Sequence, residues 1–395
     1  MPKMHNFAVV GAGVAGLASA IALARAGHGV TVFEQARQID EVGAGLQIGP
    51  NAVHALRQLD VWSALQSDTV APDRIVIKDG CSARTLSNID LTKDFESRFG
   101  APYRVAHRAN LIARLRDAAA GHPSIELRTD CPVDGFDADG KQVTVRFSGD
   151  EHQLADALIG ADGIRSTIRQ QLLEDGPPDY TGHAIFRALL PMIDVPAATN
   201  KTSVNLWLYP GGHVVHYPVN GGRELNIVAA ADSLWVEDGW RTSAERADLI
   251  SFFPAAAPQL KDLLEAPARW HKWAGTDRKP ADSWGSGPIT LIGDAAHPSL
   301  PYLAQGAAMA LEDAVVLGQC CADCTDIAPA FRQFEEARRP RTTRVAKTSK
   351  DQGRIYHLRS SAALARNIAM FALPSNISLT RLSWLYGWKP TKTAT

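Results

Sequence analysis

Apolar runs, glycine-rich turns and a helical stretch follow one another at the start of the chain. Residues 6–10 form an apolar run that predicts a buried parallel strand. Residues 17–26 are rich in alanine and leucine, which predicts a helix that ends near Gly27. A second apolar run at residues 29–33 predicts another strand. Strand, helix and strand in this order are typical of a βαβ unit in a parallel sheet.

The turn between the first strand and the helix has a glycine pattern that favours a dinucleotide site. Gly11, Gly13 and Gly16 stand in the order G-x-G-x-x-G. The first allows a tight turn, the second lets the backbone approach a pyrophosphate, and the third lets helix and strand pack closely. Glu34 ends the second strand, where its carboxylate can accept hydrogen bonds from both ribose hydroxyls. NAD and FAD both contain an adenosine pyrophosphate, so this pattern does not choose between them.

Two later apolar runs end in short turns that combine glycine with an acidic residue. Residues 157–160 lead into a Gly-Ala-Asp-Gly turn, and we expect a helix to begin at Ser166. Residues 289–292 lead into a Gly-Asp turn, and a helix follows with Gly306 at its start. At such a helix start, backbone N–H groups and the helix dipole can stabilise negative charge on a flat ring.

The middle of the chain has a different pattern of apolar and glycine residues. Three apolar runs between residues 204 and 230 alternate around glycine pairs, which predicts the strands of a meander. Such a sheet can enclose a pocket where it meets the first unit. His213 and Tyr217 fall on one face of their strand and His216 on the other. We expect the first two at the pocket, although they could merely satisfy hydrogen bonds within the sheet, and we expect His216 at the surface.

Composition excludes several classes of protein. A length of 395 residues fits two closely joined domains, and 45% hydrophobic with 21% charged residues is typical of a globular protein. The net charge of −1 gives no indication of nucleic acid or an anionic membrane as a partner. No apolar stretch reaches the roughly 18–20 residues needed to span a bilayer, and the N-terminal run lacks the basic region of a signal peptide.

The five cysteines favour reduced thiols and a cytoplasmic location, because their number is odd and no secretory signal precedes them. Cys321 and Cys324 form a C-x-x-C pair without a second pair of ligands at metal-binding spacing. We therefore expect no metal site, and we interpret the pair as small side chains at a helix end.

Taken together, these motifs resemble the group A flavoprotein monooxygenases, the family of para-hydroxybenzoate hydroxylase and salicylate hydroxylase. The three signatures of that family, G-x-G-x-x-G, D-G and G-D, occur here in the same order and spacing. Residues 107–111 also match its arginine-bearing helix start, and residues 41–47 resemble its strand beside the flavin. The resemblance implies an α/β fold like that of para-hydroxybenzoate hydroxylase, in which a β-sheet substrate domain is inserted into a Rossmann-like FAD-binding domain and helices follow at the C-terminal end.

The resemblance also implies where the domains begin and end. We expect a discontinuous FAD-binding domain formed by residues 1–72, 101–172 and 285–340. Residues 73–100 and 173–284 would form the substrate-binding sheet. The remaining residues, 341–395, have a helical pattern and would form a C-terminal helical segment.

Roles for individual residues follow from the same resemblance. Asp162 is expected near FAD and the path of the nicotinamide, although it could simply cap the helix that follows it. Arg108 is expected at the FAD linker, although it could be an ordinary surface arginine. The residues expected to bind FAD are Gly11, Gly13, Ala15, Gly16, Glu34, Gly45, Gln47, Arg108, Asp162, Asp294, Gly306 and Ala307.

In the branch that holds salicylate, 3-hydroxybenzoate and hydroxynicotinate hydroxylases, a His and a Tyr at the positions of His213 and Tyr217 face the substrate. We expect His213 to act as general base toward a phenol, with the help of Tyr217. Pro301 and Tyr302 belong to an apolar loop that we expect to contact the substrate and keep the site dry. The 3-hydroxybenzoate enzymes tend to carry a polar residue at this loop position, so its absence favours a salicylate-like substrate.

The function implied is hydroxylation of a small phenolic or hydroxylated heteroaromatic acid by FAD, NADH or NADPH, and O2, through a flavin C4a-hydroperoxide. An attack at the carbon that bears the carboxylate would release CO2. The same fold could instead act on 3-hydroxybenzoate, 6-hydroxynicotinate, urate or a quinolone, or serve as a redox-sensing flavoprotein that does not hydroxylate. An NAD-dependent dehydrogenase would leave the two later motifs unused. We expect a monomer or a homodimer.

Overall fold

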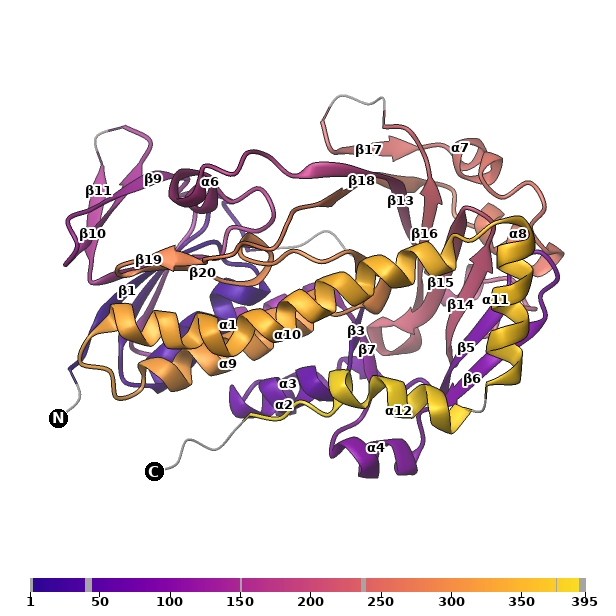
Figure 1. Ribbon diagram of the computed structural model, residues 1–395, viewed down its shortest axis with the longest axis horizontal. Coiled ribbons are helices and arrows are strands. Elements are labelled where there is room, and N and C mark those ends of the chain that lie inside the picture. Colours follow the sequence, from indigo (N-terminus) through magenta and orange to yellow (C-terminus); the bar gives the residue numbers. More distant parts are fainter. Residues whose placement is uncertain (1–2, 40–44, 150, 236–238, 374, 391–395) are drawn as a thin grey trace.

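A computed structural model describes residues 3–39, 45–149, 151–235, 239–373 and 375–390. Two sheets of different kind lie at opposite ends of the molecule, and one long helix spans both (Figure 1). The first is a six-stranded sheet in which all neighbours are parallel except the edge pair of β19 and β20. Its strands in spatial order are β19 (Gly285–Ser286), β20 (Ile289–Leu291), β12 (Ala157–Gly160), β1 (Asn6–Val10), β2 (Gly29–Phe33) and β8 (Ile125–Arg128).

The predicted βαβ unit forms the centre of this sheet. Helix α1 (Val14–Arg25) joins β1 to β2, and its residues 14–24 are all buried because the sheet, α5 (Arg108–Ala120) and α9 (Gly306–Cys321) surround it. The alanine- and leucine-rich helix predicted from the sequence therefore belongs to the core. The later strands β12 and β20 add to the same sheet side by side, so their glycine–acid turns lie at the carboxyl edge beside the first glycine loop.

Two small sheets and several helices complete this half. The elements are the antiparallel β9 (Val133–Ala138), β10 (Val143–Phe147) and β11 (His152–Ala155), the sheet of β3 (Gly45–Ile48), β4 (Thr69–Val70) and β7 (Arg104–His107), and the helices α2 (Pro50–Gln58), α3 (Trp62–Gln66), α4 (Lys93–Phe99) and α6 (Thr167–Leu173). Single turns of 3₁₀-helix are η1 (Met192–Asp194), η2 (Asn220–Gly222), η3 (Gly293–Ala295) and η4 (Pro301–Leu303). Residues 41–44, part of the segment expected beside the flavin, lie outside the described residues.

The second large sheet has eight strands, and the three strands predicted between residues 204 and 230 lie together within it. Every neighbouring pair is antiparallel except β14 and β5. In spatial order its strands are β17 (Arg241–Ala244), β18 (Trp270–Asp277), β13 (Asp179–Pro191), β16 (Glu224–Asp232), β15 (Gly212–Val219), β14 (Val204–Tyr209), β5 (Arg74–Asp79) and β6 (Thr85–Asp90).

The face of this sheet that points away from the first half is covered as well. Two helices that the sequence analysis did not predict, α7 (Arg246–Ser251) and α8 (Pro258–Glu265), pack leucines onto it. His216, expected at the surface, is only 1% exposed on this covered face, and its ring stacks on Trp207. The surface prediction for His216 was wrong because it assumed that one face of the sheet meets water.

Helices form the last part of the chain, as predicted. Helix α10 (Ile327–Tyr356) runs from beneath the six-stranded sheet to the eight-stranded sheet, and α11 (Ser360–Ala372) and α12 (Ser375–Tyr386) follow (Figure 1). Its length places buried residues in both halves of the molecule, from Phe331 near one end to Gly353 near the other. No helix among the described residues combines the length and apolar character needed to cross a membrane.

Candidate active site

One cavity connects the first glycine loop to the eight-stranded sheet. Residues from three turns of the six-stranded sheet and from the start of α9 line one side, and residues of β13, β15 and β16 line the other. Among the residues singled out in the sequence, the cavity lining includes Gly13, Ala15, Gly45, Gln47, Arg108, His213, Tyr217, Asp294, Pro301, Gly306 and Ala307. The remaining ones, Gly11, Gly16, Glu34, Asp162 and Tyr302, are not among its lining residues.

The first glycine loop has the shape that a pyrophosphate requires. A Cβ on Gly16 would lie 1.8 Å from the carbonyl oxygen of Gly11, so only glycine lets α1 begin this close to the turn. Gly11 itself has a φ of +100°, which favours glycine. Gly13 faces open space in the cavity, and among the described residues no side chain caps the first N–H groups of α1. These uncapped donors at a helix start fit a phosphate group.

Glu34 holds the same loop from the end of β2. Its Oε2 accepts a hydrogen bond of 2.8 Å from the backbone N–H of Ala12, and its Oε1 accepts one of 2.9 Å from Ala36. The carboxylate is thus fixed beside the glycine turn, where an adenosine ribose would follow the pyrophosphate.

Asp162 does cap a helix. Its Oδ2 accepts hydrogen bonds from the backbone N–H groups of Thr167 and Ile168 at the start of α6, at 2.8 and 3.2 Å. Its Oδ1 is buried and has no hydrogen-bond partner among the described residues. Buried acceptors rarely lack a partner, and this oxygen lies beside the cavity residues Ala161 and Gly163, so it can accept a hydrogen bond from a ligand.

The turn after β20 presents Asp294 to the cavity, and its side chain is exposed there. The enclosing protein removes water from this carboxyl, which raises its pKa. The positive charge of nearby Arg108 partly opposes the rise. Arg108 is half-buried, lines the cavity and begins α5, so it is no ordinary surface arginine.

A buried network of charges holds this turn in place. Asp313 accepts hydrogen bonds from the backbone N–H of Gly293 at 3.2 Å and from Arg338 at 2.7 Å, and it lies 2.5 Å from Nε2 of His297. Glu312 pairs with the same arginine at 2.9 Å, and both carboxylates are fully buried. The neighbouring charges of His297 and Arg338 outweigh burial and lower the pKa of Asp313.

The substrate side of the cavity is made by side chains of the eight-stranded sheet. His213, Val215 and Tyr217 are every second residue of β15, and all three face the cavity, as the strand period predicted. Burial raises the pKa of Tyr217, and its hydroxyl interacts with Gln47 on β3. Burial, with the nearby His357 and His183, lowers the pKa of His213 well below its usual value. At neutral pH, Tyr217 is therefore a phenol and His213 a neutral imidazole.

Tyr302 points away from the cavity, unlike its neighbour Pro301. Its hydroxyl lies 2.7 Å from Nδ1 of His183, and its ring meets the ring of His213 edge-on at 5.3 Å. The expected contact between Tyr302 and the substrate does not fit this geometry, because the side chain packs against His213 and His183 outside the cavity lining.

Three residues that the sequence analysis missed complete the site. Arg187, a lone charged residue within the apolar run of β13, lines the cavity; that isolation in a strand was a signal in the sequence. His357 and Asp232 have no comparable local signal. His357 follows α10, and its Nε2 lies 2.9 Å from Nδ1 of His213, while its Nδ1 lies 2.6 Å from Oδ1 of Asp232.

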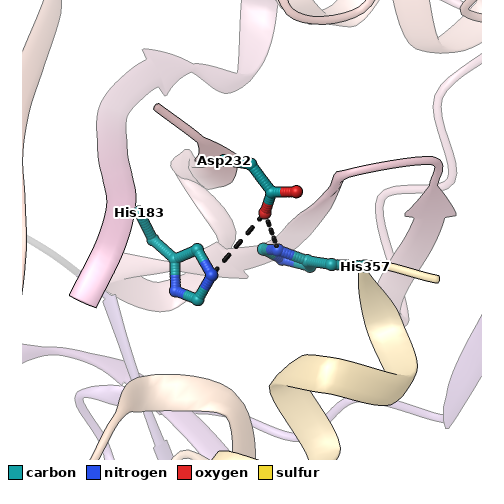
Figure 2. A group of neighbouring side chains, drawn as sticks. All are labelled: His183, Asp232 and His357. Carbon is teal, nitrogen blue, oxygen red and sulfur yellow. Dashed lines mark hydrogen bonds and ion pairs between the residues drawn. The ribbon is translucent and has the colours of Figure 1, made fainter. Parts of the chain in front are cut away.

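Figure 2 shows how three elements bring this cluster together: His183 on β13, Asp232 at the end of β16, and His357 at the end of α10 all point toward one another. His183 and Asp232 are opposite partners in the sheet, and Nε2 of His183 lies 3.6 Å from Oδ1 of Asp232. Arg359 contacts the other oxygen of Asp232 at 2.8 Å.

Comparisons with known proteins place this site in a family. A family model described as an FAD binding domain matches residues 5–349. A 3-hydroxybenzoate 6-hydroxylase of Klebsiella oxytoca is 38% identical over 390 residues, which cover 98% of each chain. A 3-amino-4-hydroxybenzoate 2-monooxygenase of Streptomyces cremeus is 35% identical over 388 residues, which cover 97% of this chain and 95% of the relative.

Solved structures agree on the fold. A salicylate hydroxylase in a substrate complex superimposes with a TM-score of 0.84 at 24% identity and covers 98% of this chain and 96% of its own. The Klebsiella pneumoniae protein HpxO, solved with FAD and uric acid, superimposes with a TM-score of 0.86 at 24% identity and covers 97% and 96%. The match extends over the motif-bearing half and the eight-stranded sheet alike. The chain therefore belongs to the FAD-binding-domain family of group A hydroxylases, and it is a flavoprotein aromatic monooxygenase that binds FAD.

Proposed function

We propose that this enzyme hydroxylates a small phenolic acid whose ring lies between the FAD site and β15, with His213 as the base that takes the phenolic proton. The observation that carries the proposal is the single cavity, lined by the dinucleotide loop on one side and by His213 and Tyr217 on the other. Bound FAD, once reduced by NAD(P)H, supplies the activation of O2 for transfer of one oxygen atom to the ring.

The protein groups in the cavity suit such an acid. Arg187 lies on the same side as His213, where its guanidinium can pair with a carboxylate. The side chains of Ile185, Val215 and Val228 also line this side and can enclose an apolar ring. Tyr217 stays protonated at neutral pH and can orient the phenolic oxygen by a hydrogen bond.

His213 acts on the phenol, because a phenolate is much richer in electrons at its ortho and para carbons than the neutral phenol. The neutral imidazole at neutral pH is the form that accepts a proton. The apolar surroundings, including Pro301, keep water from the reacting ring.

Two indications bear on the identity of the acid. The absence of a polar residue at the loop of Pro301 favours a salicylate-like substrate, as the resemblance suggested. The names of the relatives above 30% identity favour a hydroxybenzoate with its hydroxyl group away from the position next to the carboxylate, such as 3-hydroxybenzoate. We give the second indication more weight, because it rests on nearly the whole chain, and we propose 3-hydroxybenzoate first and salicylate second.

Product analysis decides between them. NADH oxidation by the FAD-loaded protein is measured with each acid, and the products are identified by mass. A dihydroxybenzoate formed in step with NADH from 3-hydroxybenzoate supports the first choice, and catechol with CO2 from salicylate supports the second. NADH consumption that neither acid accelerates, or that yields only H2O2, would refute both substrate choices.

A substitution tests the base. We expect His213→Gln to lower the rate of hydroxylation about 10²- to 10⁴-fold, the usual contribution of a general base, while the protein still binds FAD. Loss of FAD in this variant would instead make His213 a structural residue.

The remaining participants follow from the same reaction. We propose that O2 and NADH or NADPH are co-substrates and that the enzyme acts in the cytoplasm, where NAD(P)H is regenerated, as a monomer or homodimer. Residues 73–100 and 173–284 would form its substrate-binding part, between the FAD-binding segments, with residues 341–395 as the helical end.

A further inference from the structure

A continuous chain of hydrogen bonds leads from the cavity to the surface of the protein. It begins at His213, passes to His357 and reaches Asp232. His213 and His357 are 6% and 8% exposed, whereas the side chain of Asp232 is 35% exposed and meets Arg359 at the surface. The cavity and the solvent are thus connected through two imidazole rings and one carboxylate.

The hydrogen bonds fix which nitrogen of each ring carries a proton. Asp232 is ionised at neutral pH, because hydrogen bonds and the charges of its neighbours outweigh burial and lower its pKa, so it can only accept from Nδ1–H of His357. In the tautomer of His357 that donates from Nδ1, Nε2 is an acceptor, and Nδ1 of His213 donates to it. The lone pair of His213 therefore stands on Nε2, which has no hydrogen bond to the described part of the chain.

The contact with His357 compensates for the weak basicity of the buried His213. Burial disfavours a positive charge on His213, so an isolated imidazole there would hold a proton poorly. A second imidazole within hydrogen-bond distance, itself held by a carboxylate, offers the charge a better place. His357 lies directly against that carboxylate, whereas His213 does not.

We propose that His357 and Asp232 form a proton relay that draws the phenolic proton of the substrate away from His213 toward the surface. The relay rests on the proposed function, since it serves the base named there. His357 and Asp232 do not line the cavity and act through His213, so they are positioning residues.

The transfer balances without any redox step. The phenolic O–H bond breaks, and its proton forms an N–H bond with Nε2 of His213. The N–H bond at Nδ1 of His213 breaks as that proton passes to Nε2 of His357. His357 is then a cation beside the carboxylate of Asp232, and its Nδ1 proton can leave to water at the exposed edge of Asp232, while the substrate keeps the electron pair as a phenolate.

The same cluster could suggest a metal, since ligand atoms of His183, Asp232 and His357 lie within 4.8 Å of one another. Both nitrogens of His357 are, however, engaged by Asp232 and His213. Nδ1 of His183 is engaged by the hydroxyl of Tyr302. A metal would have to replace the hydrogen bonds that orient the base, so we interpret the cluster as a relay.

Several other titratable or charged groups surround these rings and affect the charge that the relay carries. His183 on β13 faces Asp232 and His357, with its pKa lowered chiefly by burial. Tyr302 and Tyr356 flank the ring of His213, and burial raises the pKa of both hydroxyls, so they stay neutral. Arg359 is the one permanent cation that contacts Asp232 in the described structure.

The test measures the protonation of a bound phenol, a readout separate from turnover. 3-Hydroxybenzoate is bound to the oxidised, FAD-loaded enzyme, and the ultraviolet difference spectrum reports the fraction of phenolate as the pH is raised. If 3-hydroxybenzoate does not bind, salicylate is titrated in the same way. His357→Gln keeps a hydrogen bond to His213 but cannot pass a proton, and Asp232→Asn keeps the shape but removes the charge. We expect each to hold about tenfold less phenolate than the wild type at the same pH.

The sign of a third variant separates a relay from mere loss of structure. Arg359→Gln removes the cation that competes with His357 for Asp232, so the phenolate fraction should stay equal or rise. Damage to the cluster would lower it in all three variants. Tyr356→Phe is the matched control, because its ring packs on His213 but its hydroxyl is not in the chain, and it should behave as the wild type.

The outcomes are distinguishable. Phenolate in the wild type that disappears in His213→Gln but is unchanged in His357→Gln and Asp232→Asn would overturn the relay and leave the base in place. A wild type that binds the acid without forming phenolate would overturn the base and the relay together. Flavin content and the thermal midpoint show that each variant is folded. If His357→Gln fails to fold, the other two variants decide: less phenolate in Asp232→Asn but not in Arg359→Gln supports the relay, and less in both overturns it.

Discussion

The two ends of the cavity are built from different parts of the polypeptide. At the dinucleotide end the chain offers mainly backbone, from the loop of Gly13 and the start of α9 at Gly306, beside the side chains of Arg108 and Asp294. At the substrate end it offers side chains, among them Arg187, His213 and Tyr217. Backbone is the same in every residue, so its placement depends on turns and helix starts, whereas the chemistry of the substrate end depends on which side chains meet.

The difference decides what can change without loss of the fold. A backbone site is fixed by local geometry, and its glycines serve either the turn itself, as Gly16 does, or the approach of the ligand, as Gly13 does. A site made of side chains can be altered residue by residue on an intact sheet, so one fold can act on different substrates. Substitutions of the first group should therefore weaken or abolish FAD binding, and those of the second should change only the reaction.

The largest effect is expected from a substitution of Gly16. We expect Gly16→Ala to abolish FAD binding and to destabilise the fold, because the added Cβ would lie 1.8 Å from the carbonyl oxygen of Gly11. That oxygen belongs to backbone and cannot move without opening the turn. The purified protein should lack the flavin absorption, and circular dichroism should report a lowered thermal midpoint.

Gly13→Ala is the matched control. Its Cβ would meet nothing within 4 Å, but it would project into the cavity where the pyrophosphate is expected. The thermal midpoint without FAD should stay as in the wild type, while FAD binding weakens by roughly tenfold or more, which corresponds to about 1.4 kcal/mol. Equal loss of stability in both glycine variants would show that the two positions do not differ as the geometry indicates.

A second substitution tests whether the backbone of the dinucleotide end depends on buried charges. Arg338→Met leaves Asp313 buried without its guanidinium partner and leaves Glu312 with Arg341 alone among the described cations, which should lower the free energy of unfolding by about 3–5 kcal/mol. Because Asp313 also holds the amide of Gly293, FAD should bind more weakly as well. Urea unfolding and a flavin titration measure the two effects.

Arg354 provides the control, since its ion pair with Asp351 is largely exposed. Arg354→Met should change the free energy of unfolding by no more than about 0.5 kcal/mol. A comparable loss in both variants would mean that the pair at Arg338 gains nothing from being buried.

The sequence predicted which turns meet at the dinucleotide end, for a physical reason. Gly11, Gly16 and Glu34 act within one βαβ unit, so residues that are close in the chain are close in space, and the pattern carries the geometry with it. The carboxyl ends of parallel strands meet at one edge, which explains why the later turn at Asp294 reaches the same cavity.

The substrate end was predictable only in part. The period of a strand placed His213 and Tyr217 on one face. It could not place His357, which meets His213 from 144 residues away through the end of α10. It also could not direct Tyr302, because an apolar loop does not indicate which of its side chains turns inward.

The last prediction concerns His216, which precedes the cavity-lining Tyr217 on β15 but lies on the opposite face of the sheet and takes no part in the site. Burial, with the nearby Lys78, lowers its pKa to about 3, and neither ring nitrogen has a hydrogen-bond partner among the described residues. The unfolded chain binds a proton there below a pH of about 6.5, whereas the folded protein resists it until about 3. Stability should therefore fall as the pH decreases through this window.

His216→Leu removes this proton and keeps an apolar contact with Trp207. Between pH 7.5 and pH 5.0 the wild type should lose about 2 kcal/mol more stability than the variant, since each pH unit below 6.5 contributes about 1.4 kcal/mol. Urea unfolding at both pH values measures the difference, and His271→Gln, at an exposed position of β18, should lose as much as the wild type. Hydroxylation should be unaffected in His216→Leu, in contrast to His213→Gln, because the two histidines lie on opposite faces of the sheet. Equal acid sensitivity of wild type and His216→Leu would mean that the ring of His216 can take up its proton in the folded protein and that this face of the sheet is less tightly covered than its packing indicates.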